Sequence, residues 1–315
     1  MNKIIYAPLC IFLWKKYHLV EKVLDEIISL KEFPLTKIYI FVDSSKKNSK
    51  FYADNQILIN KVKKYEKYQN IKIIYRKKNF GLSKNIISGI NEVIKKYNKI
   101  IILEDDLLVA KDFLYYMNKS LEEYKNNKSV ISISAFNHSS YRTFINSNYK
   151  YDNFFNMRAS SWGWATWKNR WDLFLKKIPI KEIEKNKKII ISNLGLDVYL
   201  SLIGINKKNK DLWAANWCFA SLKNKLFTSY PVVSRVSNIG FDGSGQGGYS
   251  KNFENKLKIK RKKNLSFKKN ITIDNYKKNQ FIKRYNQNFI LQYLKFFMPD
   301  PLKIFIKNNI YLNKN

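Results

Sequence analysis

The chain has 315 residues, 45% hydrophobic and 16% aromatic, so it can bury a sizeable core in one large domain or two small ones. Its net charge of +35 favours polyanionic partners such as nucleic acid, anionic lipid or phosphorylated substrates, although heavy use of Lys, Asn, Ile and Tyr points to compositional bias for most of it. Two cysteines and two histidines argue against a disulfide framework and a zinc site, and no apolar run approaches the ~18 residues of a membrane-spanning helix.

The first half of the chain alternates strand and helix patterns. The apolar residues around Leu9–Leu13 predict a first core strand rather than a signal peptide, because Pro8 interrupts the apolar run and no small-residue cleavage site follows. Further strands are predicted over 37–42, 71–75, 99–104 and 130–134, and helices over 18–30, 54–68, 86–97 and from 113 onward. This alternation predicts βαβ units and a mostly parallel sheet.

Three acidic residues follow one of these strands directly. The apolar run Ile100–Leu103 is typical of a strand buried on both faces, and it leads into Glu104, Asp105 and Asp106. Open α/β sheets bind ligands at the carboxyl ends of their strands. Crowded carboxylates repel one another, and a divalent cation with a diphosphate would compensate them. A solvated acidic turn is the alternative interpretation of this spacing.

The second half is rich in tryptophan and ends in a glycine-rich segment. Trp162, Trp164, Trp167 and Trp171 follow neither a helical nor a strand period, whereas a predicted helix over 211–225 carries two more tryptophans on one face. Such clusters indicate core packing or, alternatively, a platform for sugar rings. A predicted strand over 232–238 leads into residues 240–248, where five glycines in nine residues are typical of a mobile lid.

Several stretches in order resemble a known family. They are 76–85 (RKKNFGLSKN), 104–106 (EDD), 112–114 (DFL), 162–167 (WGWATW) and 236–241 (VSNIGF). Together they resemble GT-A-fold, nucleotide-sugar-dependent glycosyltransferases, in particular bacterial sugar transferases of surface-polysaccharide loci related to the N-acetylglucosaminyltransferase that starts complex N-glycans. The resemblance runs from about 7 to 248. It implies an α/β, Rossmann-like domain over 1–250, with a nucleotide-sugar-binding half (1–135) and an acceptor half with the lid (136–250).

The resemblance also implies roles for individual residues. Asp106 matches the ligand of a metal ion, Mn²⁺ or Mg²⁺, and Asp105 matches the residue that contacts the ribose. Glu104 matches a residue near the donor sugar, Asp43 one beside the base, and Arg76 one near the diphosphate or base. Further matches are Asn79, Gly81 and Asn85 for the donor, and Trp162, Trp164, Trp213, Gly243 and Gly245 for the acceptor or lid.

The catalytic base is where this chain departs from the family pattern. The resembling enzymes carry an aspartate after the first tryptophan of the later helix, but here Ala214 and Ala215 follow Trp213. Asp211 and Asp242 are the remaining candidates; they could instead be a helix N-cap and a turn residue, respectively. We prefer Asp242, because it would reach the site only when the lid closes. The further possibility that neither residue is the base stays open.

The implied activity is metal-dependent, inverting transfer of a hexosyl or N-acetylhexosaminyl group. The donor would be a nucleotide-diphosphate sugar, with a UDP-sugar favoured, and the acceptor a hydroxyl of a bacterial surface glycan such as lipooligosaccharide or capsule, free or lipid-linked. The alternatives are transfer of another nucleotide-linked group by the same fold, a catalytically inactive sugar-binding relative, and a nucleic-acid-binding protein. Against specific nucleic-acid binding, the basic residues are spread over the whole chain and no known nucleic-acid-binding motif occurs.

The C-terminal segment, 251–315, is predicted to be a basic amphipathic tail. Residues 256–269 are dominated by Lys and Arg, and dense apolar residues follow over 289–306, interrupted by Pro299 and Pro301. Basic amphipathic segments bind anionic membrane surfaces. We therefore expect a cytoplasmic enzyme, peripheral on the inner face of the plasma membrane. The alternative is a terminal helix packed on the main domain.

Overall fold

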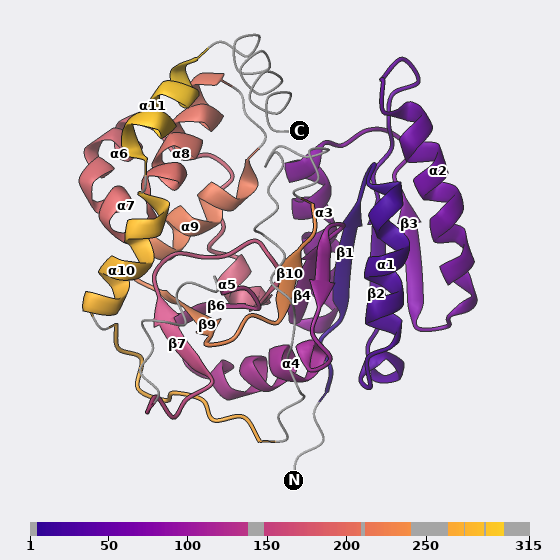
Figure 1. The fold of residues 1–315 in the computed structure, drawn as a ribbon, viewed down its shortest axis with the longest axis horizontal. Coiled ribbons are helices and arrows are strands. Elements are labelled where there is room, and N and C mark those ends of the chain that lie inside the picture. The colour runs from indigo at the N-terminus through magenta and orange to yellow at the C-terminus, as the bar shows by residue number, and fades with distance from the viewer. Residues whose placement is uncertain are drawn as a thin grey trace, which may run out of the picture.

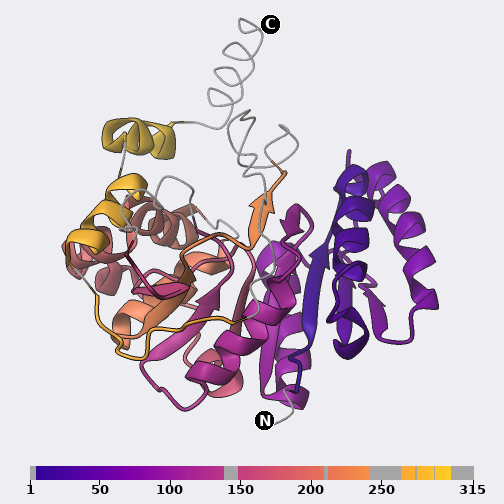
Figure 2. The same cartoon turned by 60° about the horizontal axis from the view of Figure 1, so that its bottom comes forward.

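The computed structural model describes residues 5–137, 148–208, 212–240, 264–273, 275–286 and 288–298. Their centre is a mixed eight-stranded sheet with the strand order β3-β2-β1-β4-β8-β6-β9-β7, and helices flank it (Figure 1 and, turned by 60°, Figure 2). This arrangement confirms the predicted α/β, GT-A-type fold with a mostly parallel sheet.

The parallel half of the sheet holds the predicted βαβ units. Its elements are β1 (Leu9–Leu13), α1 (Tyr17–Ile28), β2 (Ile38–Val42), α2 (Tyr52–Lys63), β3 (Ile71–Tyr75), α3 (Leu82–Tyr97) and β4 (Lys99–Glu104), with short 3₁₀ turns at Phe33–Leu35 and Lys64–Lys67. Strands β3, β2, β1 and β4 run parallel in that order. Their carboxyl ends therefore lie at one edge of the sheet.

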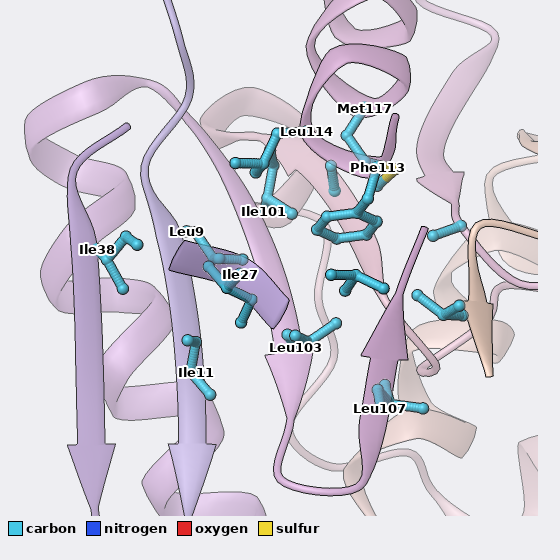
Figure 3. Packing of buried hydrophobic residues seen from close by; sticks show 14 of the residues in the cluster. Leu9, Ile11, Ile27, Ile38, Ile101, Leu103, Leu107, Phe113, Leu114 and Met117 are labelled. Carbon is cyan, nitrogen blue, oxygen red and sulfur yellow. The ribbon is translucent and has the colours of Figure 1, made fainter. Parts of the chain in front are cut away.

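Two hydrophobic cores cover the two faces of this sheet. Successive residues of a strand point to opposite faces, and in β1 Leu9 and Ile11 belong to one core whereas Cys10 and Phe12 belong to the other. The first core packs β1, β2 and β4 against α1 and α4 (Phe113–Tyr124), as Figure 3 shows. The central strands are therefore apolar on both faces, as predicted for the run 100–103 within β4.

The second half of the sheet departs from the simple alternation. Its elements are β5 (Leu107–Val109), β6 (Val130–Ser134), β7 (Asn153–Asn156), β8 (Trp164–Trp167), α5 (Lys168–Trp171), α6 (Ile180–Lys185), α7 (Lys187–Leu194), α8 (Leu196–Lys208), α9 (Trp213–Lys223), β9 (Phe227–Pro231) and β10 (Val236–Asn238). Strand β8 runs antiparallel between β4 and β6. Strand β10 pairs with β5 in a separate two-stranded ribbon, which places the residues after β10 beside those after β4.

The described part of the predicted tail packs on the rest of the chain. Helix α10 (Asn275–Tyr285) lies against α7, and α11 (Phe289–Phe297) against α8 (Figure 1). The segment before α10 is tied to α4, because the Tyr124 hydroxyl donates to the Lys268 carbonyl oxygen over 2.9 Å and the Phe267 ring contacts Tyr124. For 264–298 this supports terminal packing, the alternative to a separate tail. The stretches 251–263 and 299–315 lie outside the described residues.

Candidate active site

A cavity of about 1020 Å³ opens at the carboxyl ends of the parallel strands. One wall comes from residues that follow β1, β2 and β4, and the other from the segment after β7 and from α8, α9 and α10. The predicted residues that line it are Asp43, Asn79, Gly81, Asn85, Glu104, Asp105, Asp106, Trp162 and Trp213. The fold thus gathers most of the predicted residues at one place.

The acidic triplet is neutralised in part by a lysine. Lys16 lies in the loop between β1 and α1. It donates from Nζ to Asp106 Oδ2 over 2.5 Å and lies 3.8 Å from Asp105 Oδ1. The side chains of Lys16, Asp105 and Asp106 are at most 15% exposed. Burial, and then Asp106 and Asp105, raise the pKa of Glu104 to about 8. Burial followed by Asp106 raises the pKa of Asp105 to about 6.

Lys16 stays charged despite its burial. Burial alone would lower its pKa, but the Asp105 and Asp106 carboxylates outweigh that effect and raise it. A divalent cation was predicted to compensate the acids, and this lysine was not singled out from the sequence. Strands β1 and β4 are parallel neighbours with Phe12 beside Glu104, so the residues that follow the two strands meet, and only this pairing reveals Lys16.

The carboxylate oxygens of the acidic triplet suit a hard divalent cation. Carboxylate oxygens suit Mg²⁺ and Mn²⁺, and such ions often take one or two protein carboxylates, with phosphate and water supplying the rest. Within the described ranges no group of three or more His, Cys, Asp or Glu side chains is placed to hold a metal ion. Asp106 could supply one ligand, and Lys16 would have to release it first.

Asp43 holds the turn that precedes α3. Its carboxylate is buried and accepts hydrogen bonds from the backbone N–H groups of Ser44, Phe80 and Gly81, at 2.9, 2.8 and 3.0 Å. Burial raises its pKa, and these hydrogen bonds oppose that rise. Gly81 has φ of 76°, a region that favours glycine. Asn79 donates to the Ser44 carbonyl oxygen over 2.6 Å, so the turn is fixed at the cavity wall.

Arg76 lies outside the lining of the cavity. Its guanidinium donates to Asn85 Oδ1 over 3.0 Å and to Ser88 Oγ over 3.2 Å, and it lies 3.8 Å from Glu92. These contacts hold it along α3. Asn85 therefore lines the cavity, as do the other residues predicted to bind the nucleotide sugar. Arg76 lies beside the cavity and does not line it.

The tryptophans divide between the core and the cavity. Trp164 is completely buried and packs on Trp213, with ring centroids 5.4 Å apart, and on Trp171 and Trp217. The expectation that Trp164 contacts an acceptor is thereby corrected in favour of core packing, because strand β8 turns this ring toward α9. Trp162 and Trp213 line the cavity.

The glycine-rich segment begins directly against the acidic triplet. The Ile239 N–H donates to the Asp106 carbonyl oxygen over 2.8 Å, and a Cβ atom added at Gly240 would lie 2.3 Å from Asp106 Oδ2 and 2.6 Å from Lys16 Nζ. Only a glycine fits there without displacing that ion pair. The other predicted lid and base residues, Asp211, Asp242, Gly243 and Gly245, lie outside the described residues, so the identity of the base stays a prediction.

The far wall holds three residues that the sequence pattern does not mark. Arg158, Asp197 and Tyr285 line the cavity and come from the segment after β7, from α8 and from α10. Arg158 pairs with both carboxylate oxygens of Asp197 and lies over the Tyr285 ring. No local pattern links three residues so far apart in the chain, so only the fold could reveal them.

Comparisons with known proteins point to one family. The model of "Glycosyl transferase family 2" matches residues 9–182, and no curated protein sequence matches the chain significantly. Among solved structures, the chain is similar to the mannosyltransferase PcManGT from Pyrobaculum calidifontis in complex with GDP-Man and Mn²⁺, at 14% identity over 53% of this chain and 46% of that chain, with a TM-score of 0.39.

Two other solved structures show similar levels of likeness. One is GalNAc-T7 with UDP, GalNAc and Mn²⁺, at 9% identity over 74% of this chain and 43% of that chain, with a TM-score of 0.48. The other is S. aureus TarS 1-349, at 10% identity over 73% of this chain and 59% of that chain, with a TM-score of 0.42. The chain thus spans about half the length of the solved structures that it matches.

Proposed function

This chain belongs to glycosyl transferase family 2, and on that premise we propose that it transfers a sugar from a nucleotide-diphosphate sugar to a hydroxyl group of a glycan. The observation that carries this proposal is the acidic triplet at the end of β4, which lies in the cavity beside Lys16 and the turn held by Asp43. A UDP-sugar is the favoured donor, and transfer is proposed to invert the anomeric centre.

The described residues supply distinct parts of this chemistry. Asp106 would hold a Mn²⁺ or Mg²⁺ ion, which when bound acts as a Lewis acid on the leaving diphosphate. Lys16 adds a further positive charge at the same corner. The fixed negative charge of Asp105 favours an oxocarbenium-like transition state. In the transfer, the acceptor oxygen bonds to the anomeric carbon, and the diphosphate leaves with the electrons of the broken bond.

Deprotonation of the acceptor requires a base, for which we propose Asp242, with Asp211 as the second candidate. Support for Asp242 comes from the start of its segment, because Gly240 lies against Asp106. Closure of that segment over the donor would exclude water, which otherwise hydrolyses it.

Screening nucleotide sugars tests this function. Purified chain with Mn²⁺ is incubated with UDP-, GDP- and other nucleotide-linked sugars, and release of nucleoside diphosphate is measured with and without a mixture of glycan acceptors. We expect metal-dependent release from one donor, accelerated by acceptor. If no donor turns over but the chain binds random DNA in a salt-dependent manner, the nucleic-acid alternative replaces this proposal.

We further propose that the acceptor is a bacterial surface glycan, lipid-linked, and that the chain binds anionic membranes at the cytoplasmic face. No helix among the described residues is long and apolar enough to cross a membrane. The support lies on α11, where Ile290, Leu294 and Phe297 are 73%, 56% and 66% exposed. Spacings of four and three residues put these side chains on one helix face, which suits an interfacial helix.

Co-sedimentation with anionic liposomes tests the membrane proposal. Truncating the chain near Lys251 would remove core side chains such as Phe281, so substitution on α11 is the cleaner change. The variant with serine at Ile290, Leu294 and Phe297 should bind much less than wild type at low salt. Replacing two other exposed residues, Leu35 and Ile57, by serine is the matched control. Equal binding by all three proteins would leave only the general positive charge as its cause.

A further inference from the structure

A rigid charge pair stands on the wall of the cavity opposite the parallel strands. Arg158 Nη1 donates to Asp197 Oδ1 over 2.9 Å and Nη2 to Oδ2 over 2.7 Å, a bidentate pair. Nη1 also donates to the Leu194 carbonyl oxygen. The guanidinium carbon lies 3.7 Å from the centre of the Tyr285 ring. Together these contacts fix the plane of the guanidinium and therefore the position of the carboxylate.

The surrounding backbone is packed closely around this pair. Gly195 has φ of 103°, and an added Cβ would lie 2.7 Å from Asp197 Oδ1 and 2.6 Å from Tyr285 Cβ. Burial opposes the charge of Arg158, but Asp197 outweighs it and raises the pKa of the guanidinium, so Arg158 stays charged. Replacing such a partly buried pair by apolar residues is often neutral or stabilising. Stability alone therefore gives little reason for its presence at a cavity wall.

The two partners differ in what they present to the cavity. The Arg158 side chain is 13% exposed, whereas that of Asp197 is 41% exposed. The terminal nitrogens of the guanidinium are already engaged, but each carboxylate oxygen keeps a lone pair for another donor. Trp213, Tyr230 and Tyr285 line the cavity as well. This wall therefore offers fixed acceptor oxygens beside aromatic rings.

We infer that Asp197, oriented by Arg158, binds two adjacent hydroxyl groups of a neutral pyranose, the acceptor sugar. Hydroxyl groups donate to a carboxylate, and the apolar C–H face of a sugar ring packs on aromatic side chains. An acidic sugar would bring its own carboxylate toward Asp197 and be repelled. This inference rests on the proposed function, because it assigns the acceptor subsite of the same cavity, and it sets a preference for uncharged acceptors.

Saturation-transfer NMR with simple glycosides tests the subsite. The probes are methyl β-galactopyranoside, methyl β-glucopyranoside and methyl β-glucuronide, each titrated into the full chain with UDP and Mn²⁺ present. We expect at least one neutral glycoside to bind at least ~10-fold more tightly than the glucuronide. Asp197→Asn should weaken that neutral binding by ~10-fold or more, because hydrogen bonds to a charged group are lost.

Two further variants keep the test decisive. Ser201 lines the cavity one turn after Asp197 on α8, and Ser201→Trp should block the sugar while leaving the ion pair in place, even if Asp197→Asn fails to fold. Asp172, which pairs with Lys168 at the surface, is the matched control, and Asp172→Asn should bind like wild type.

Several results would overturn the inference. They are glucuronide binding as tight as that of the neutral glycosides, absence of neutral binding by wild type, and unchanged neutral binding in Ser201→Trp. Binding of UDP with Mn²⁺, followed in the same samples, separates this outcome from failure of the proposed function. Loss of sugar binding with UDP binding retained concerns the acceptor subsite alone, whereas wild type that binds no nucleotide at all contradicts the proposed function.

Discussion

Glu104 should make the metal-free protein less stable as pH rises. Its pKa is 4.5 as an ordinary carboxyl and about 8 in the folded chain, because of burial and its acidic neighbours. Between these values the folded state keeps a proton that the unfolded state has lost, so the free energy of unfolding falls with increasing pH. At 1.36 kcal/mol for each pKa unit, the difference between pH 4 and pH 9 amounts to about 5 kcal/mol.

Urea unfolding in chelator at pH 5, 7 and 9 measures this effect. Glu104→Gln removes the titrating group, and this variant should lose most of the decline that wild type shows between pH 5 and pH 9. Glu122→Gln is the matched control, because Glu122 is 43% exposed and pairs with Lys125 on the surface of α4. Parallel pH profiles for wild type and Glu104→Gln would refute the account of the acidic triplet.

Three further predictions concern the donor corner and the base. Asp106→Asn should abolish metal-dependent transfer but leave the fold intact, as checked by turnover and by thermal unfolding. Gly240→Ala should weaken binding of UDP with Mn²⁺ by ~10-fold in calorimetry, because its Cβ would lie 2.3 Å from Asp106 Oδ2 and displace the carboxylate proposed to hold the metal ion. Asp242→Asn should lower turnover by ~10²-fold with donor affinity retained, whereas Asp211→Asn should be mild, and the reverse ranking would assign the base to Asp211.

The parallel half of the fold could be predicted because its signals are local. Strands β1 and β3 lie at the predicted residues, Leu9–Leu13 and Ile71–Tyr75. Each is a short run rich in apolar residues that is followed by a helical pattern, and predicting such a run needs no knowledge of its neighbours. The role of the acids after β4 could be predicted in a similar way, because ligands bind at the carboxyl ends of the strands in this topology.

The second half gave weaker signals because its strands bury polar groups. In β9, Thr228 and Ser229 are completely buried, and Thr228 Oγ1 lies 2.8 Å from Ser132 Oγ. In β7, Asn153 is buried and donates to Ser229 Oγ over 2.8 Å. Hydrogen bonds across the sheet satisfy these polar side chains in the folded chain. In the sequence alone, such polar residues resemble those of a surface loop. The strand predicted over 232–238 is also shorter than expected, because β10 begins only at Val236.

The site was predictable where it follows a strand and unpredictable where it depends on tertiary contacts. Asp43 and the acidic triplet stand at strand ends, and the fold brings them to one cavity. Lys16 could be found only from the pairing of β1 with β4. Arg158 and Asp197 meet through the packing of α8, which leaves no periodic signal in the chain.

Thermal unfolding with nucleoside diphosphates tests the central claim, that this cavity binds the donor through a metal ion at Asp106. With Mn²⁺ present, one of UDP, GDP, ADP or CDP at 100 times its dissociation constant should stabilise the wild-type chain by about 2.7 kcal/mol. Chelator, or the Asp106→Asn substitution, should remove that stabilisation. Stabilisation by none of these nucleotides, or equal stabilisation in chelator and in Asp106→Asn, would contradict the account.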